Sequence, residues 1–163
     1  MKRISILGSG WLGLPLAIEL SQANYQIKAS SRSTERLTQL RKANIEAHVY
    51  DIDVQEARQV IDEHDFLQAD ILVINITSKN IEAFKQLITH IEKSTIQQVL
   101  FVSSTSVFKN SPHLDSAPVS EFDTDQLQEC PLLKIEGLFQ KNPNFQTTII
   151  RFSGLIGYQR HPG

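Results

Sequence analysis

The chain alternates two kinds of apolar pattern. Short continuous apolar runs are typical of strands buried on both faces, and apolar residues repeating every three or four positions are typical of helices that cover a sheet. Six strands are predicted, at Arg3–Leu7, Gln26–Ser30, Ile45–Tyr50, Ile71–Ile76, Gln98–Ser103 and Thr147–Phe152. Helices are predicted between them, at Trp11–Ala23, Thr34–Ala43, Val54–Glu63, Ile81–Ile91 and Leu132–Gln140.

This alternation predicts an α/β fold with a doubly wound parallel sheet in three α/β/α layers. Right-handed crossovers put a ligand crevice at the carboxyl ends of the strands, beside the first one. A single domain over residues 1–163 is expected, because this length supports one core. The long stretch Lys109–Cys130 carries Pro112 and Pro118 and shows no periodicity. Such loops are more often functional than idle.

Composition excludes several classes of protein. The net charge of −2 gives no electrostatic case for nucleic acid or for an anionic membrane surface. No apolar run is long enough to cross a bilayer, and the apolar start breaks at once into glycines, unlike a signal peptide. A single cysteine fits a reducing compartment, so a cytoplasmic protein is expected. The histidines lack metal-ligand spacing, and no metal site is predicted.

The glycine-rich turn after the first strand carries the most specific chemistry. It reads Gly8-Ser9-Gly10-Trp11-Leu12-Gly13 and opens an amphipathic helix. In such a loop Gly8 allows the tight turn, Gly10 lets the backbone approach a pyrophosphate, and Gly13 lets the helix pack closely on the sheet. The helix N-terminus adds unpaired N–H groups for the anion. A dinucleotide site is therefore predicted, with a ligand-free glycine turn as the alternative.

The end of the second strand indicates which dinucleotide binds. An NAD site has an acidic residue there for the ribose 2′-hydroxyl, whereas this chain has Ser31-Arg32-Ser33 and no acid between Glu19 and Glu35. The Arg32 guanidinium can donate to a 2′-phosphate, so NADP(H) is predicted ahead of NAD(H). A solvated surface arginine is the alternative. Asn75, Ile76 and Thr77 end the fourth strand and should line the cofactor beside the glycine loop.

Two further motifs carry a family resemblance. The fifth strand runs into Ser103-Ser104-Thr105-Ser106-Val107-Phe108, and the sixth into Arg151-Phe152-Ser153-Gly154-Leu155-Ile156-Gly157. Together with the glycine loop they resemble the atypical and extended short-chain dehydrogenase/reductases, the branch similar to NAD-dependent epimerase/dehydratases and nucleoside-diphosphate-sugar epimerases. The resemblance implies a Rossmann fold and an active-site hydroxyl at Ser104. It also implies a carboxylate near the adenine, at Asp51 or Asp53, and an acid of the substrate loop at Glu121.

The catalytic Tyr-x-x-x-Lys of that family is missing. None of Tyr25, Tyr50 and Tyr158 has a lysine four residues later. The most similar segment is Cys130-Pro131-Leu132-Leu133-Lys134. Its pattern indicates that Cys130 precedes a helix with proline at the first helical position. Lys134 is the candidate that reaches the cofactor ribose, although an alignment through Glu136 would displace it.

The leading hypothesis is an NADP(H)-binding, epimerase/dehydratase-like oxidoreductase of the atypical short-chain type. It would act on a small molecule, with sugar nucleotides as one class. The alternative is a non-catalytic dinucleotide-binding module or redox sensor that lost the Tyr-x-x-x-Lys. Relatives continue beyond this length into a C-terminal lobe, so most of the substrate half is expected to be absent. The apolar face of Ile81–Ile91 fits a homodimer as well as it fits packing on its own sheet.

Overall fold

The computed structural model describes residues 1–54, 63–108 and 130–157. Its six strands pair in parallel in one sheet, in the order β3-β2-β1-β4-β5-β6. They are β1 (Arg3–Leu7), β2 (Gln26–Ser31), β3 (Glu46–Val49), β4 (Ile71–Ile74), β5 (Gln98–Ser104) and β6 (Gln146–Phe152). This is the strand order of the doubly wound dinucleotide-binding fold, and it confirms the predicted Rossmann architecture.

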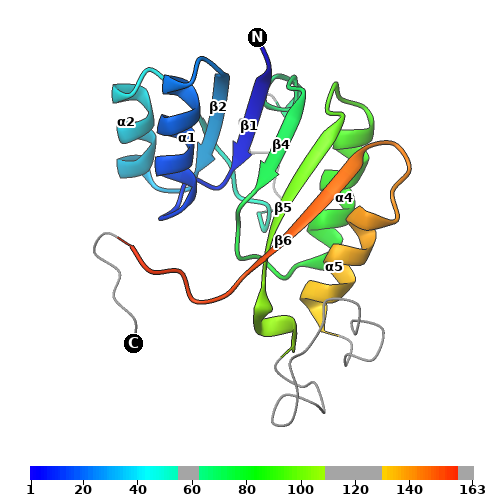
Figure 1. Cartoon of the computed structure of the whole chain (residues 1–163). Coiled ribbons are helices and arrows are strands. Elements are labelled where there is room, and N and C mark those ends of the chain that lie inside the picture. The colour runs from blue at the N-terminus through cyan, green and yellow to red at the C-terminus, as the bar shows by residue number, and fades with distance from the viewer. Residues whose placement is uncertain (55–62, 109–129, 158–163) are drawn as a thin grey trace.

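Helices cover both faces of the sheet (Figure 1). They are α1 (Gly13–Gln22), α2 (Thr34–Lys42), the short α3 (Glu63–Phe66), α4 (Ile81–Glu92) and α5 (Pro131–Gln140), with a 3-10 turn η1 (Thr105–Phe108) after β5. The helices α1 and α2 pack on one face, and α4 and α5 on the other. Among the described residues, no helix combines the length and the apolar character that crossing a membrane requires.

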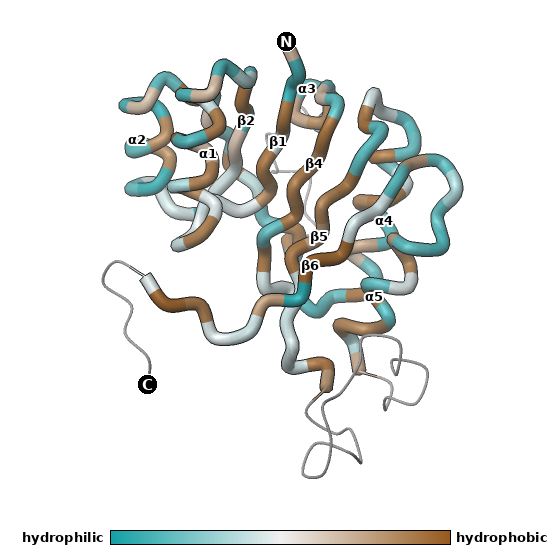
Figure 2. Tube along the Cα trace, in the orientation of Figure 1, coloured by the Kyte–Doolittle hydropathy of each residue, from teal (hydrophilic) through white to brown (hydrophobic). Residues whose placement is uncertain are grey.

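The alternation of side chains along the central strands explains the continuous apolar runs. In β4, Leu72 and Ile74 join the core beneath α4 and α5, whereas Val73 joins the core beneath α1. Successive residues of a strand point to opposite faces, so a strand covered on both sides needs apolar residues at every position. Figure 2 shows the hydrophobic residues running along the middle of the sheet.

The helix ends follow the sequence closely. Ser33 caps α2 by accepting a hydrogen bond from the Arg36 N–H at 3.4 Å, as predicted. Cys130 caps α5 through its sulfur, and Pro131 is the first helical residue, which confirms the structural interpretation of this cysteine. The first helix begins at Gly13 rather than Trp11, because residues 8–12 form the loop itself.

Two predicted segments lie largely outside the described residues. The helix predicted at Val54–Glu63 falls on residues 55–62, and α3 begins where that prediction ends. The long stretch Lys109–Cys130, including Glu121, falls on residues 109–129.

An ion pair between Arg3 and Asp70, at the start of the sheet, should make the free energy of unfolding depend on pH. The Asp70 carboxylate accepts hydrogen bonds from the Arg3 backbone at 2.8 Å and from its guanidinium at 2.9 Å. The Arg3 side chain, and then its backbone N–H, hold the pKa of Asp70 below its ordinary value. A depressed carboxyl pKa contributes stability that is present above the unfolded-state value of about 3.9 and is lost as the pH falls through the folded value.

We therefore expect the free energy of unfolding to fall less steeply below pH 4 in Asp70→Asn than in the wild-type chain. Urea unfolding at a series of pH values measures both slopes. Parallel pH profiles of the free energy of unfolding for the two proteins would contradict the role assigned to the Arg3–Asp70 ion pair.

Candidate functional site

A cleft of about 670 Å³ opens at the carboxyl ends of β1, β2, β3 and β4. We call it the glycine-loop cleft. It brings together predicted cofactor residues from four separate loops. These are Gly8, Ser9, Gly10, Ser31, Arg32, Ser33, Asp51, Asn75, Ile76 and Thr77. Trp11, Leu12 and Gly13 complete the turn into α1 but do not line the cleft. This cleft therefore lies where strand order and crossover handedness predict a ligand crevice.

Two of the three glycines hold the loop in a shape that side chains would prevent. Gly8 has φ +100°, and a methyl group there would overlap the Asn75 carbonyl oxygen. A methyl group at Gly13 would overlap the Gly8 carbonyl oxygen and lie 2.9 Å from Asn75 Nδ2. At Gly10, by contrast, nothing lies within 4 Å of such a group. Gly8 and Gly13 are thus required by the protein itself, whereas Gly10 leaves open space along the cleft.

Two features leave hydrogen-bonding groups available beside Gly10. Ser9 is 1% exposed, and its Oγ has no hydrogen-bond partner among the residues that the structure describes. The α1 N-cap, Leu12, supplies no side-chain hydrogen bond to the first turn, unlike the caps of α2, α4 and α5. Buried polar groups are normally paired, and uncapped helix N-termini bind anions. The residues present therefore fit a diphosphate.

The end of β2 adds positive charge and hydroxyl groups to the cleft. Arg32 lies on the surface with its Nη1 3.4 Å from Asp51 Oδ2, a long and exposed ion pair. Arg36, from the first turn of α2, also lines the cleft and was missed in the sequence. The sequence feature that could have indicated Arg36 is the Ser33 cap, because a helix that begins after Ser33 has its first turn at the mouth of the cleft.

The other lining residues missed in the sequence come from the same loops. They are Glu35, Tyr50, Ile52 and Ser78. Asp53, the alternative predicted for the adenine contact, lines the cleft together with Asp51. The Ser78 hydroxyl donates to Asp53 Oδ1 at 2.7 Å, which ties the loop after β4 to the loop after β3.

A smaller cleft of about 210 Å³ adjoins the first and contains Ser104. We call it the Ser104 cleft. Its lining is Asn75, Ile76, Thr77, Ser78, Lys79, Val102, Ser103, Ser104, Ser106 and Leu132. The Ser104 Oγ accepts a hydrogen bond from the Ser106 N–H at 3.1 Å, so this serine caps the turn η1 while facing the cleft. Both sequence-based interpretations of Ser104 are compatible with this position.

A buried ionic network fixes the rotation of α5. Glu136 is 1% exposed and pairs with Arg151 of β6, at 2.6 Å to Nη2 and 3.2 Å to Nε. The Ser103 hydroxyl donates to the same carboxylate, and the Phe108 ring lies 5.2 Å from the Arg151 guanidinium carbon. The network joins α5, β5, β6 and η1 behind Ser104.

That rotation places the predicted Lys134 away from both clefts. Residues of a helix advance by about 100° each, so Leu132 lies nearly above Glu136 and Lys134 lies on the opposite side. Leu132 accordingly lines the Ser104 cleft, whereas Lys134 is exposed and lines neither cleft. In α5, therefore, Leu132 and Glu136 face the β5 and β6 side, and Lys134 lies on the opposite side of the helix.

Trp11 packs against the Arg151–Gly157 motif rather than into the glycine-loop cleft. A methyl group built on Gly157 would lie 2.8 Å from the Trp11 indole, so the indole lies directly beside this glycine. Figure 1 shows the segment after β6 leading back toward the start of α1. The Arg151–Gly157 motif therefore meets the glycine loop at Trp11.

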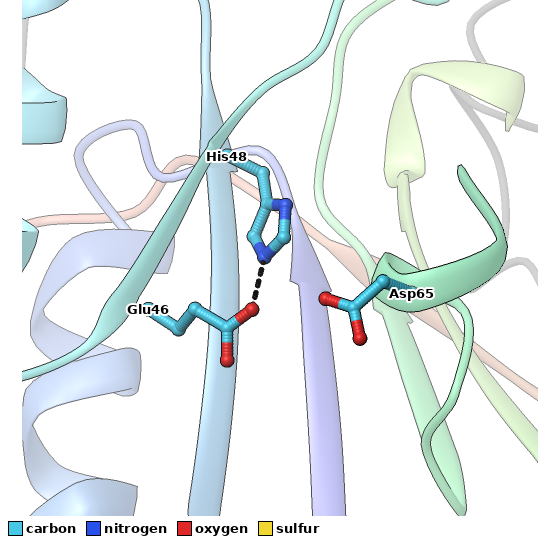
Figure 3. A group of neighbouring side chains, drawn as sticks. All are labelled: Glu46, His48 and Asp65. Carbon is cyan, nitrogen blue, oxygen red and sulfur yellow. Dashed lines mark hydrogen bonds and ion pairs between the residues drawn. The ribbon is translucent and has the colours of Figure 1, made fainter. Parts of the chain in front are cut away.

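A possible metal group lies outside both clefts, where no metal was predicted. Glu46, His48 and Asp65 come within 4.8 Å of one another (Figure 3). The largely buried Lys28 ammonium already contacts two of them, at 2.7 Å from Asp65 Oδ1 and 3.7 Å from Glu46 Oε1. Its hydrogen bond lowers the pKa of Asp65. A divalent cation would have to displace this lysine, so the group is best described as a salt-bridge cluster.

Comparison with known proteins places the chain in a family. The family model described as NAD(P)H-binding matches residues 8–156. The curated protein YeeZ of Escherichia coli K12 is 26% identical over 171 residues, covering 100% of this chain and 62% of that protein. The chain therefore spans less than two thirds of the length of this relative.

Solved structures share the fold. A protein assigned as an NAD-dependent epimerase/dehydratase from Methylobacillus flagellatus superposes with a TM-score of 0.69 at 25% identity, covering 98% of this chain and 56% of that one. A short-chain dehydrogenase/reductase superfamily protein from Agrobacterium tumefaciens with bound NAD gives 0.69 at 18% identity, covering 91% and 48%. The chain thus belongs to the NAD(P)H-binding family, with the Rossmann fold of the epimerase/dehydratase-like short-chain dehydrogenase/reductases.

Proposed function

We propose that this chain binds NADP(H) in the glycine-loop cleft and forms the cofactor-binding part of an oxidoreductase of the atypical, epimerase/dehydratase-like short-chain type. One observation carries the proposal. The buried, unpartnered Ser9 hydroxyl lies next to the open backbone of Gly10, at the uncapped start of α1. This arrangement offers a dinucleotide diphosphate several N–H and O–H donors and space to approach them.

The end of β2 supports NADP(H) over NAD(H). A 2′-phosphate placed there would lie among Arg32, Arg36, Ser31 and Ser33, all of which line the cleft. The competing contact between Arg32 and Asp51 is long and exposed, and such pairs are worth about 1 kcal/mol at most. A phosphate, with charge-assisted hydrogen bonds, can therefore replace it.

The Ser104 cleft would hold the reacting part of the substrate. The cofactor, when bound, supplies hydride transfer to or from a small carbonyl or alcohol, sugar nucleotides being one class of substrate. Ser104 can donate a hydrogen bond to a carbonyl oxygen from its position between Ser106 and the cleft. The Glu136–Arg151 network behind it keeps β5 and η1, and hence Ser104, in place.

The position of Lys134 favours one alternative, a dinucleotide-binding module without catalysis. In the described part of the chain no tyrosine lines the Ser104 cleft, and Lys134 is exposed on the far side of α5. A screen of NADPH oxidation with small carbonyls and sugar nucleotides separates the two functions. Turnover of any of them supports the enzyme, and cofactor binding without turnover supports the module.

Calorimetry with NADPH and NADH tests cofactor choice. We expect the wild-type chain to bind NADPH more tightly than NADH, and Arg32→Ala to weaken NADPH binding by about tenfold or more, since a charge-assisted hydrogen bond contributes about 1.5–3 kcal/mol. Binding of NADH should barely change in the variant.

Arg41→Ala is the matched control, because Arg41 lies in the last turn of α2, away from the cleft, and carries the same charge. Tighter binding of NADH than of NADPH by the wild-type chain would contradict the choice of NADP(H). If Arg32→Ala weakened the binding of NADPH and NADH equally, the assignment of Arg32 to the 2′-phosphate site would be wrong.

A further inference from the structure

The Ser104 cleft contains a lysine that the family resemblance does not supply. Lys79 lies between β4 and the Asn80 cap of α4 and lines this cleft together with Ser104 and Ser106. It enters from the β4 side, whereas the predicted Lys134 belongs to α5, on the β5 and β6 side. Since α5 turns Leu132 rather than Lys134 into the cleft, Lys79 is the cationic residue that lines it among the described residues.

Within the described part of the chain, the charge of Lys79 is not cancelled by a carboxylate. No carboxylate in the described ranges forms an ion pair with it, and the cleft lining contains no aspartate or glutamate. Glu136, the buried carboxylate behind Ser103, is already neutralised by Arg151. The described lining thus carries a net positive charge and several hydroxyl groups.

The hydroxyl groups differ in what they can offer a ligand. Ser103 donates to Glu136 and is committed to the ionic network. Ser104 accepts from the Ser106 N–H, which leaves its own O–H free to donate elsewhere. A hydroxyl donor beside a lysine suits a ligand with two acceptor groups, one neutral and one anionic.

We infer that Lys79 is the substrate-binding cation of this site, and that the cleft takes a small carbonyl compound bearing a carboxylate or phosphate. The anionic group pairs with Lys79, and the carbonyl oxygen accepts a hydrogen bond from Ser104. This inference rests on the proposed function, because a carbonyl next to the cofactor is the group that hydride transfer would reduce. Lys79 is a binding residue here, and it neither donates nor removes the proton of the reaction.

Titration of the NADP⁺-loaded chain, followed by amide chemical shifts, tests the inference. The probes are pyruvate and acetone, two small ketones that differ in the carboxylate. We expect pyruvate to shift the amides of Ile76, Ser104 and Ser106 and to bind about tenfold more tightly than acetone. In Lys79→Met the pyruvate affinity should fall by about tenfold, to the level of acetone, because a charge-assisted contact is lost.

Lys85→Met is the matched control. Lys85 is exposed like Lys79 but lies on α4, pairs with Glu82 and lines neither cleft, so its removal should leave pyruvate binding unchanged. Equal thermal unfolding of the two variants shows that both are folded. Equal binding of pyruvate and acetone, or unchanged pyruvate binding in Lys79→Met, would overturn the assignment.

Cofactor binding distinguishes failure of this inference from failure of the proposed function. Lys79 does not line the glycine-loop cleft, so Lys79→Met should bind NADPH as the wild-type chain does. If the chain binds NADPH but pyruvate shifts no amides, the role of Lys79 is wrong and the proposed cofactor site is unaffected. Absence of NADPH binding in the wild-type chain overturns the proposed function itself.

Discussion

Replacing Gly13 by alanine is expected to lower the free energy of unfolding by about 3 kcal/mol or more, the upper range for overpacking a filled interior. The added methyl group would overlap the Gly8 carbonyl oxygen and press on Asn75 Nδ2 at 2.9 Å. The two groups are also bonded to each other, since Asn75 Nδ2, from the end of β4, donates to the Gly8 carbonyl oxygen at 3.2 Å. The backbone cannot yield without separating α1 from β1 and β4, and the glycine-loop cleft would change shape with it.

Urea unfolding of Gly13→Ala measures the effect, with Gly137→Ala as the control. Gly137 lies inside α5 with nothing within 4 Å of the added methyl group, so alanine there should be neutral or stabilising by up to about 1 kcal/mol. A Gly13→Ala chain that unfolds within about 0.5 kcal/mol of the wild type, the range of an ordinary surface substitution, would contradict the close packing described for this loop.

Removing the Arg151 side chain is expected to cost about 3–5 kcal/mol of stability, because it leaves a buried carboxylate without its counter-charge. Glu136 is 1% exposed and accepts hydrogen bonds from two guanidinium nitrogens, and the Ser103 hydroxyl alone cannot neutralise it. The change to make is Arg151→Met, which keeps much of the side-chain volume. Unfolding of this variant in guanidinium chloride measures how much the free energy of unfolding falls.

The double variant Arg151→Met with Glu136→Gln separates the lost charge pair from lost packing. Glutamine can still accept from Ser103 but carries no charge, so the double variant should recover a large part of the stability lost in Arg151→Met. A double variant no more stable than Arg151→Met would show that the loss comes from packing against Phe108 rather than from the unpaired carboxylate.

Much of the fold could be predicted because its signals are local. The apolar run Ile71–Ile76 predicted a strand covered on both faces, and β4 is such a strand. The apolar stripe of Ile81–Ile91 predicted the buried face of α4. Ser33 predicted a helix cap from the residue type and its place before the helix. Strand order then followed from general rules of connection, and these brought the glycine loop, Arg32 and Asn75 to one cleft.

What could not be predicted depends on contacts between distant parts of the chain. The sequence contains Glu136 and Arg151, yet only the pairing of β5 with β6 and the packing of α5 bring them together. That pair turns α5 so that Lys134 faces away, which spacing along the sequence could not decide. Lys79 was overlooked for the same reason, since its cleft is made with residues of β5 and α5.

The central claim is that NADP(H) occupies the glycine-loop cleft, and a crystal structure of the chain grown with NADPH tests it most directly. We predict the diphosphate against the Gly10 backbone, within hydrogen-bond distance of Ser9 Oγ, and the 2′-phosphate beside Arg32 in place of its contact with Asp51. A cofactor bound elsewhere, or crystals that hold none at millimolar NADPH, would contradict the claim.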